Sequence, residues 1–332
     1  MPKRAARAAA YAAAAAALLA ASAGAAAAPT AGNQKVRVFW KPQRADGGAA
    51  GLARELDGVL AFGAGAVSLY CGHGPLANGS FGVVPDPPQR WGVATLCAPA
   101  LRLLAARGVP TMIMASARSD FPGLAEAVAL GGDAFGGQAR AVLEALEAPL
   151  AASRMPPLGL DLDFERGKDK AAPIPSAADF AAFTGGVKAA LNAKGGKPRR
   201  MDVCVDTFCS FLSDYALLTS KGGADSVTDM GLYHAGSRAE FASKLAASVA
   251  AAGASAPATL AAGISLYPQG AWENSTASAT ERLDVLSGAG VRSAAVFVWP
   301  TLDVPGAASP DLKRAWQSAL SRWAAAGHYR DW

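Results

Sequence analysis

The sequence predicts a single α/β domain with the (β/α)8 architecture of a TIM barrel. Short apolar, β-branched or aromatic runs recur eight times, and stretches rich in Ala, Leu and Arg with helical character separate them. Neither a Pro/Ser-rich linker nor an internal repeat divides off a second module. Strands that alternate with helices favour a parallel sheet, and eight such units close a barrel.

The start of the chain has the composition of a secretory signal. Three basic residues precede a long run of Ala and Leu, and small residues suited to cleavage follow. We expect residues 1–27 to form the signal peptide, residues 28–35 a short N-terminal segment, and residues 36–332 the folded domain. The prediction is a secreted protein. A transit peptide, which would place the protein in an organelle lumen, and an uncleaved anchor are also compatible with this composition.

Charge and cysteine content narrow the class of protein. The formal net charge of +5 falls to +2 once the three basic residues of the leader are removed, so the mature chain lacks the positive charge typical of nucleic-acid binding. Cys71, Cys97, Cys204 and Cys209 are compatible with two disulfides, in a pairing that the sequence does not fix. No Cys-x-x-Cys motif or cluster of histidines indicates zinc. We expect a monomer without membrane association after leader cleavage.

The expected elements follow in order along the chain. The last expected helix carries Trp316 and Trp323 on one face, and this spacing indicates core packing. The expected strands cover residues 36–40, 66–71, 110–116, 158–165, 201–207, 227–234, 260–267 and 294–299, and the clearest helical stretches cover residues 94–107, 138–152, 177–191, 238–251, 280–287 and 311–326.

The strand at residues 158–165 carries the strongest functional signal. It reads Leu-Gly-Leu-Asp-Leu-Asp-Phe-Glu, and because alternate side chains of a strand point to opposite faces, Asp161, Asp163 and Glu165 share one face. Adjacent carboxylates suppress one another's ionisation, so at least one should keep a proton near neutral pH, as a general acid must. A solvated face on an edge strand and a site for a hard divalent cation would also fit this pattern. Glu165 ends its strand, where TIM barrels place catalytic residues.

The same alternation predicts aromatic side chains at the ends of later strands. Tyr233 shares a face with Asp229 in the sixth strand, Tyr267 ends the seventh, and Trp299 ends the eighth. Aromatic rings at the mouth of a barrel are good platforms for the apolar faces of sugars. We therefore expect these rings to surround the carboxylates.

Two further residues near strand ends are candidates for substrate binding. Trp40 ends the first strand, and Asp206 ends the fifth. Asp206 either lines a sugar subsite or caps the turn that follows it.

The carboxylate strand resembles the signature of glycoside hydrolase family 18, which reads Asp-x-x-Asp-x-Asp-x-Glu and often has Gly second. Gly159, Asp161, Asp163 and Glu165 match this signature, whereas Leu158 stands where the family usually has its first aspartate. The resemblance implies a barrel enzyme that cleaves β-1,4-linked N-acetylglucosamine in chitin or chitooligosaccharides with retention of configuration. It implies no metal and no cofactor.

The resemblance also implies a role for each site residue. The acetamido group of the substrate, not a protein carboxylate, would be the nucleophile. Glu165 would protonate the glycosidic oxygen and then activate water, Asp163 would orient the acetamide, and Asp161 would share a proton with Asp163. Tyr233 would hold the acetamide oxygen near the anomeric carbon. Trp299 would form the floor beneath the scissile sugar.

Other features separate this chain from many chitinases of the family. His234 replaces the Asp or Asn that usually follows the tyrosine, and the 26 residues between Tyr267 and Ala294 leave no room for the small α+β domain that many of those enzymes insert there. We therefore expect a shallow, open groove. Three different functions also stay open on the same barrel: a non-catalytic chitooligosaccharide-binding lectin, an endoglycosidase acting on the N-glycan core, and a metal-dependent hydrolase.

Overall fold

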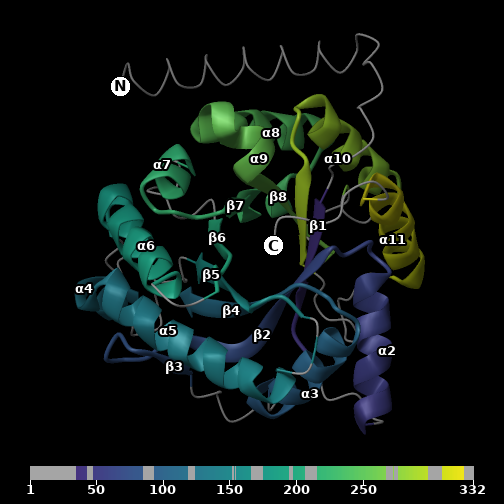
Figure 1. Cartoon of the computed structure of the whole chain (residues 1–332). Coiled ribbons are helices and arrows are strands. Elements are labelled where there is room, and N and C mark those ends of the chain that lie inside the picture. Colours follow the sequence, from purple (N-terminus) through teal and green to yellow (C-terminus); the bar gives the residue numbers. More distant parts are fainter. Residues whose placement is uncertain are drawn as a thin grey trace, which may run out of the picture.

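The computed structural model describes residues 35–42, 48–84, 93–118, 124–151, 153, 155–165, 175–193, 197–205, 215–266, 272, 276–297 and 309–324. In Figure 1 the strands form an inner ring, and the helices form a layer around it. The expected signal peptide, residues 1–27, lies outside the described residues. Within those residues, no helix combines the length and apolar character needed to cross a membrane.

Eight parallel strands close the barrel, which confirms the predicted fold. Neighbouring strands pair in the order β1-β9-β8-β7-β6-β5-β4-β2, and a parallel pairing of β1 with β2 joins the two ends. The barrel strands are Lys35–Trp40 (β1), Ala66–Pro75 (β2), Thr111–Arg118 (β4), Gly159–Glu165 (β5), Met201–Val205 (β6), Ser226–Asp229 (β7), Leu260–Ser265 (β8) and Ser293–Phe297 (β9).

A short strand, β3 (Phe81–Val83), lies outside this ring and pairs antiparallel with the end of β2. It is not among the strands predicted from the sequence.

In the described residues, the α-helices are Gly48–Leu60 (α2), Val93–Ala106 (α3), Leu124–Leu130 (α4), Gly132–Glu147 (α5), Ala177–Leu191 (α6), Tyr215–Ser220 (α7), Arg238–Ala252 (α8), Ala256–Thr259 (α9), Thr276–Gly288 (α10) and Pro310–Ala324 (α11). The 3-10 helices cover Ala148–Leu150 (η1), Met230–His234 (η3) and Gly253–Ser255 (η4).

Residues 266–292 separate β8 from β9, and the 13-residue helix α10 takes up much of this stretch. It has no room for an insertion domain, as predicted.

Serine caps fix where two of the surrounding helices begin. The Ser176 hydroxyl oxygen accepts a hydrogen bond from the backbone N–H of Asp179 at the start of α6, at 3.1 Å. Ser237 does the same for Glu240 at the start of α8, at 3.2 Å. Each cap satisfies a backbone donor that the first turn of a helix leaves unpaired.

The outward face of β5 packs in the core between the barrel and the helices. Leu160, Leu162 and Phe164 are buried there, and the Phe164 ring lies 5.8 Å from the ring of Phe180 on α6. Elsewhere in the helical layer, Trp316 of α11 is also buried, which confirms its predicted packing role. Burial of these side chains on one face leaves the other face of β5 for the barrel interior.

Strand β7 ends five residues earlier than predicted. A side-chain oxygen of Asp229 accepts the backbone N–H of Gly231 at 2.8 Å and caps the 3-10 helix η3, so the chain leaves the sheet at this point. The other oxygen accepts a hydrogen bond from Ser248 of α8, which places Asp229 against the helical layer. The prediction that Asp229 and Tyr233 share one strand face is therefore wrong.

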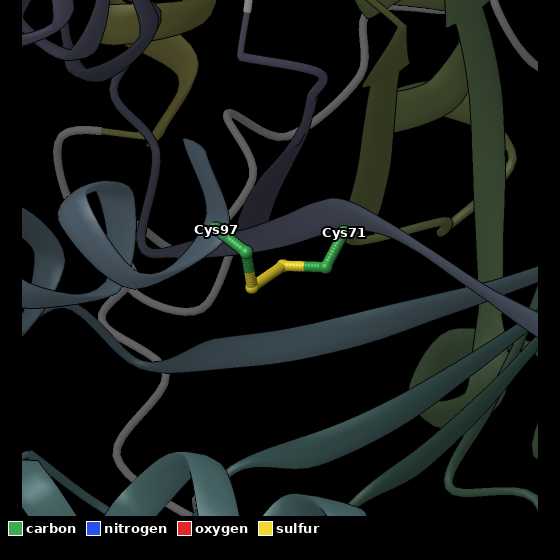
Figure 2. Close-up of a disulfide and its surroundings, with 2 residues drawn as sticks. All are labelled: Cys71 and Cys97. Carbon is green, nitrogen blue, oxygen red and sulfur yellow. A yellow bond between two sulfur atoms is a disulfide. The ribbon is translucent and has the colours of Figure 1, made fainter. Parts of the chain in front are cut away.

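The cysteines form one disulfide among the described residues. It joins Cys71 at the end of the barrel part of β2 to Cys97 on α3, as Figure 2 shows. Cys204 is a buried free thiol inside the barrel, and Cys209 lies outside the described residues. A second disulfide would need all four cysteines, and the free thiol of Cys204 excludes it.

Candidate active site

Strand β5 brings the three carboxylate residues into register with its neighbours. Asp161 pairs with Asp202 of β6, and Asp163 pairs with Ser116 of β4. Glu165 is the last residue of the strand and still pairs with β4. Its side chain lies outside the described part of the structure, so its catalytic role stays a prediction.

Asp161 is fully buried inside the barrel. One of its carboxylate oxygens accepts a hydrogen bond from the Ser68 hydroxyl at 2.5 Å and lies 3.3 Å from Nη1 of Arg37. The other accepts the S–H of Cys204 at 3.3 Å. Burial raises the pKa of Asp161; the charge of Arg37 opposes this rise, and the charge of Asp202 adds to it. Asp161 therefore binds a proton more strongly than an exposed aspartate does.

Arg37 extends from β1 into the barrel interior and bonds to side chains of β6 and β7. Its guanidinium is about 1 % exposed, donates from Nη1 to Asp202 and from Nη2 to Thr228, and contacts Asp161 as well. Burial would raise the pKa of Asp202, but the charges of Arg200 and Arg37 outweigh it, and the pKa is lowered. A buried charge is tolerated only when ion pairs and hydrogen bonds of this kind surround it.

Asp163 lies one pleat nearer the carboxyl ends of the strands and is partly exposed. One of its oxygens lies 3.4 Å from the Ser116 hydroxyl, which donates a hydrogen bond to it. Asp161 and Asp163 thus differ in environment: the first is fully buried, and the second is partly exposed.

Aromatic side chains line the upper part of the barrel interior. Tyr233 is nearly buried, and its ring stacks on that of Phe297 with 6.2 Å between centroids. Phe297 in turn lies 6.2 Å from Phe39 of β1. The ring of Tyr70 on β2 faces the ammonium group of Lys41 at 4.9 Å. Tyr233 belongs to this aromatic group, and its predicted contact with substrate stays a prediction; the other three rings were not predicted.

Trp40 has a different role from the one predicted. Its ring is fully buried in the core that the helices cover, and its Nε1–H donates to Glu55 of α2 at 3.3 Å. The structure therefore assigns it to packing, not to substrate binding. Tyr267, Trp299 and Asp206 lie outside the described residues, so their predicted contacts with substrate stay predictions.

The start of β5 is held by an ion pair between α5 and the segment that precedes β6. Leu158 is buried, its backbone N–H donates to Glu147 of α5 at 2.5 Å, and its carbonyl accepts from Arg199 at 2.9 Å. Glu147 and Arg199 are themselves paired through two hydrogen bonds. The backbone of the carboxylate strand is thus fixed from outside the barrel.

The described side chains do not contain three His, Cys, Asp or Glu residues grouped to hold a metal ion. A metal site made by all three carboxylates of β5 would include Glu165, whose side chain lies outside the described part of the structure. A metal ion bound there would make turnover sensitive to a chelator.

Comparisons with known proteins find the same fold. No family model and no curated protein matches the chain. Among solved structures, the C-terminal domain of a chitinase-like protein from Desulfitobacterium hafniense aligns with a TM-score of 0.58 at 10% identity, over 88% of this chain and 99% of that one. The catalytic domain of a family GH18 chitinase from the fern Peteris ryukyuensis gives 0.55 at 14% identity, over 87% and 100%. GH5_18 from Streptomyces cattleya, in complex with GlcNAc, gives 0.55 at 16% identity, over 89% and 81%.

Proposed function

We propose that this protein is a glycoside hydrolase that cleaves β-1,4-linked N-acetylglucosamine by substrate assistance. The observation that carries the proposal is strand β5, which turns Asp161 and Asp163 into the barrel and places Glu165 at its carboxyl end. The family 18 signature on this strand and the likeness to TIM-barrel glycoside hydrolases support it. TIM barrels carry their active sites at this end.

In the proposed mechanism, Glu165 protonates the glycosidic oxygen as the bond breaks. The acetamide oxygen of the substrate attacks the anomeric carbon, and Asp163 stabilises the positive charge that develops on the acetamide nitrogen. Asp161 holds the proton that it shares with Asp163, in keeping with its raised pKa. Tyr233 positions the acetamide, and Glu165 then activates the water that opens the cyclic intermediate.

We also propose that the protein is secreted. The basic and then apolar leader supports this location. The Cys71–Cys97 disulfide supports it independently, because disulfides persist in oxidising compartments.

The acetamide requirement gives the sharpest test of this mechanism. We expect the purified protein to hydrolyse a fluorogenic chitotrioside and to leave the matched substrate without its N-acetyl groups uncleaved, because only the first carries the nucleophile. Equal rates on both substrates would contradict substrate assistance. Loss of activity with a chelator would favour a metal-dependent hydrolase.

Two further outcomes would indicate a lectin or an endoglycosidase. Binding of chitooligosaccharide in calorimetry without any turnover would indicate the lectin. Release of N-glycans from a glycoprotein without cleavage of chitotriosides would indicate the endoglycosidase.

A further inference from the structure

Inside the barrel, one cation forms ion pairs with two buried carboxylates. Nη1 of Arg37 donates a hydrogen bond to Asp202. The same nitrogen lies 3.3 Å from a carboxylate oxygen of Asp161, with which it forms an ion pair but no hydrogen bond. Thr228 holds the other Nη of Arg37 and orients the guanidinium. The positive charge of Arg37 therefore stabilises the carboxylate of Asp202 more than that of Asp161. Without Asp202, Arg37 would pair with Asp161 alone.

A second cation reaches only one of the two carboxylates. The Nε–H of Arg200 donates to the second oxygen of Asp202 at 2.9 Å, at the start of β6. This guanidinium is partly exposed, whereas Asp161 and Asp202 are not. The two acids thus share one arginine, and Asp202 has an additional one.

The remaining surroundings of Asp161 carry little charge. The strands around it contribute Ser68 of β2, Met112 and Met114 of β4, and small apolar side chains on β8 and β9. In the described part of the barrel, the titratable or charged groups nearest to Asp161 are Arg37 on β1, Asp163 on its own strand, and Asp202 and Cys204 on β6. Arg200 lies behind Asp202, and Tyr70 and Tyr233 lie nearer the carboxyl ends of the strands.

We propose that Arg37 and Asp202 are positioning residues for the carboxylate strand: Asp202 draws the guanidinium of Arg37 towards itself and so leaves Asp161 able to hold a proton. The proposal rests on the proposed function, in which Asp161 shares that proton with Asp163. It adds that the proton is kept by two residues that no substrate would touch. Cys204, whose thiol pKa is raised by burial, donates to Asp161 and stays protonated.

Two substitutions should move the proton affinity of Asp161 in opposite directions. Asp202→Asn removes the competitor and a like charge, so Arg37 turns to Asp161 and the titration midpoint of Asp161 falls by about one pH unit or more. Arg200→Gln leaves Asp202 dependent on Arg37 alone, so the midpoint of Asp161 rises. Arg200 lies at the partly exposed end of the cluster, so this variant tests the proposal even if Asp202→Asn does not fold.

The measurement is a pH titration followed by NMR of protein labelled with ¹³C at the aspartate carboxyl groups. The Asp161 resonance is assigned from the spectrum of Asp161→Asn. Glu144→Gln is the matched control, because it removes a carboxylate that pairs with Arg140 on the outer surface of α5 and does not touch the barrel interior. We expect this control to leave the midpoint of Asp161 unchanged.

The same variants give a second readout through activity. The part of the pH profile of kcat that depends on the proton of Asp161 should shift down in Asp202→Asn and up in Arg200→Gln. A purely structural role would lower kcat at every pH without moving the profile. A midpoint of Asp161 that stays within about 0.3 pH unit in both variants would overturn the proposal. The NMR titration needs no turnover, so it decides the proposal even if the wild-type protein proves inactive and the proposed function fails.

Discussion

Arg37 shows most clearly what a single residue can contribute to this barrel. A charged side chain between Val36 and Val38 in a predicted strand would ordinarily be expected on the solvent-exposed face. Arg37 is instead buried and forms ion pairs with Asp202 and Asp161 inside the barrel. The alternation predicted which residues share a face, but not which face points inward. For the same reason Trp40 was assigned to the wrong side of its strand. A buried arginine needs carboxylate partners, and Asp161 and Asp202 in two other predicted strands were the sequence signal that Arg37 could point inward.

Gly263 is the residue whose size decides where Tyr233 can lie. A Cβ atom at this position would come within 2.5 Å of the Asp229 carbonyl oxygen and 2.7 Å of the Tyr233 ring. We expect Gly263→Ala to lower the free energy of unfolding by about 1 to 3 kcal/mol, because the backbone of η3 must shift. It should also reduce kcat, because Tyr233 moves. Urea denaturation measures the first effect and steady-state kinetics the second.

Gly137→Ala is the matched control for this substitution. Its Cβ would meet nothing within 4 Å, and it lies in helix α5, where Ala is favoured over Gly by up to about 1 kcal/mol. We expect unchanged or slightly higher stability. A Gly263→Ala variant as stable and as active as the wild type would contradict the packing described for Tyr233.

At the scale of elements, the long periodic segments were predictable and the short ones were not. Helix α6 begins and ends as predicted, because a serine cap and an apolar face agree on its limits. Strand β7 continues in the hydrophobic pattern, but the Asp229 side chain bonds to the backbone two residues later and starts a 3-10 helix. Strand β3 has only three residues, and the central one is Gly82, so no periodicity can be detected there.

The disulfide gives a test at this scale. It ties β2 to α3 across 26 positions of the sequence, and closing a loop of that length should stabilise the fold by about 3 kcal/mol, mainly by restricting the unfolded chain. We expect a reducing agent to lower the unfolding midpoint of the wild type, and Cys71→Ala/Cys97→Ala to show the same loss without any response to reductant.

Cys204→Ala is the control, because this thiol forms no disulfide. It should keep the sensitivity to reductant. A wild type that loses the disulfide in mass spectrometry and yet unfolds at the same denaturant concentration would contradict this account.

For the whole molecule, the barrel could be predicted because eight strands and their helices follow one another along nearly the entire chain. The closure of the barrel through β1 and β2 follows from that count. What the sequence did not reveal is the chemistry of the interior, because contacts such as Arg37 with Asp202 join residues 165 positions apart. The carboxylates of β5 were predictable, since their spacing is local, whereas their partners were not.

Stability of the whole fold should depend on pH through Asp229. Burial raises the pKa of this carboxyl, although hydrogen bonds from Ser248, Gly231 and Tyr215 and the charge of Lys244 oppose the rise. A carboxyl with a higher pKa in the folded state stabilises the fold below its unfolded pKa, about 3.9, and this contribution disappears as the pH rises through the folded pKa. Asn at this position does not titrate.

We therefore expect Asp229→Asn to gain stability relative to the wild type as the pH is raised from about 4 to about 7. The difference between the two proteins is measured by urea denaturation at each pH, so that all other titrating groups cancel. A difference that stays constant, or that moves in the opposite direction, would show that the hydrogen bonds outweigh burial.

The central claim is that Glu165, at the end of the carboxylate strand, is the general acid of a glycoside hydrolase. The most direct test is the release of fluorophore from a chitotrioside by the wild type, by Glu165→Gln, and by Glu144→Gln, a control on the outer surface of α5. The account predicts turnover by the wild type and the control, and loss of turnover in Glu165→Gln with unchanged unfolding and oligosaccharide binding. Substantial activity in Glu165→Gln would contradict it.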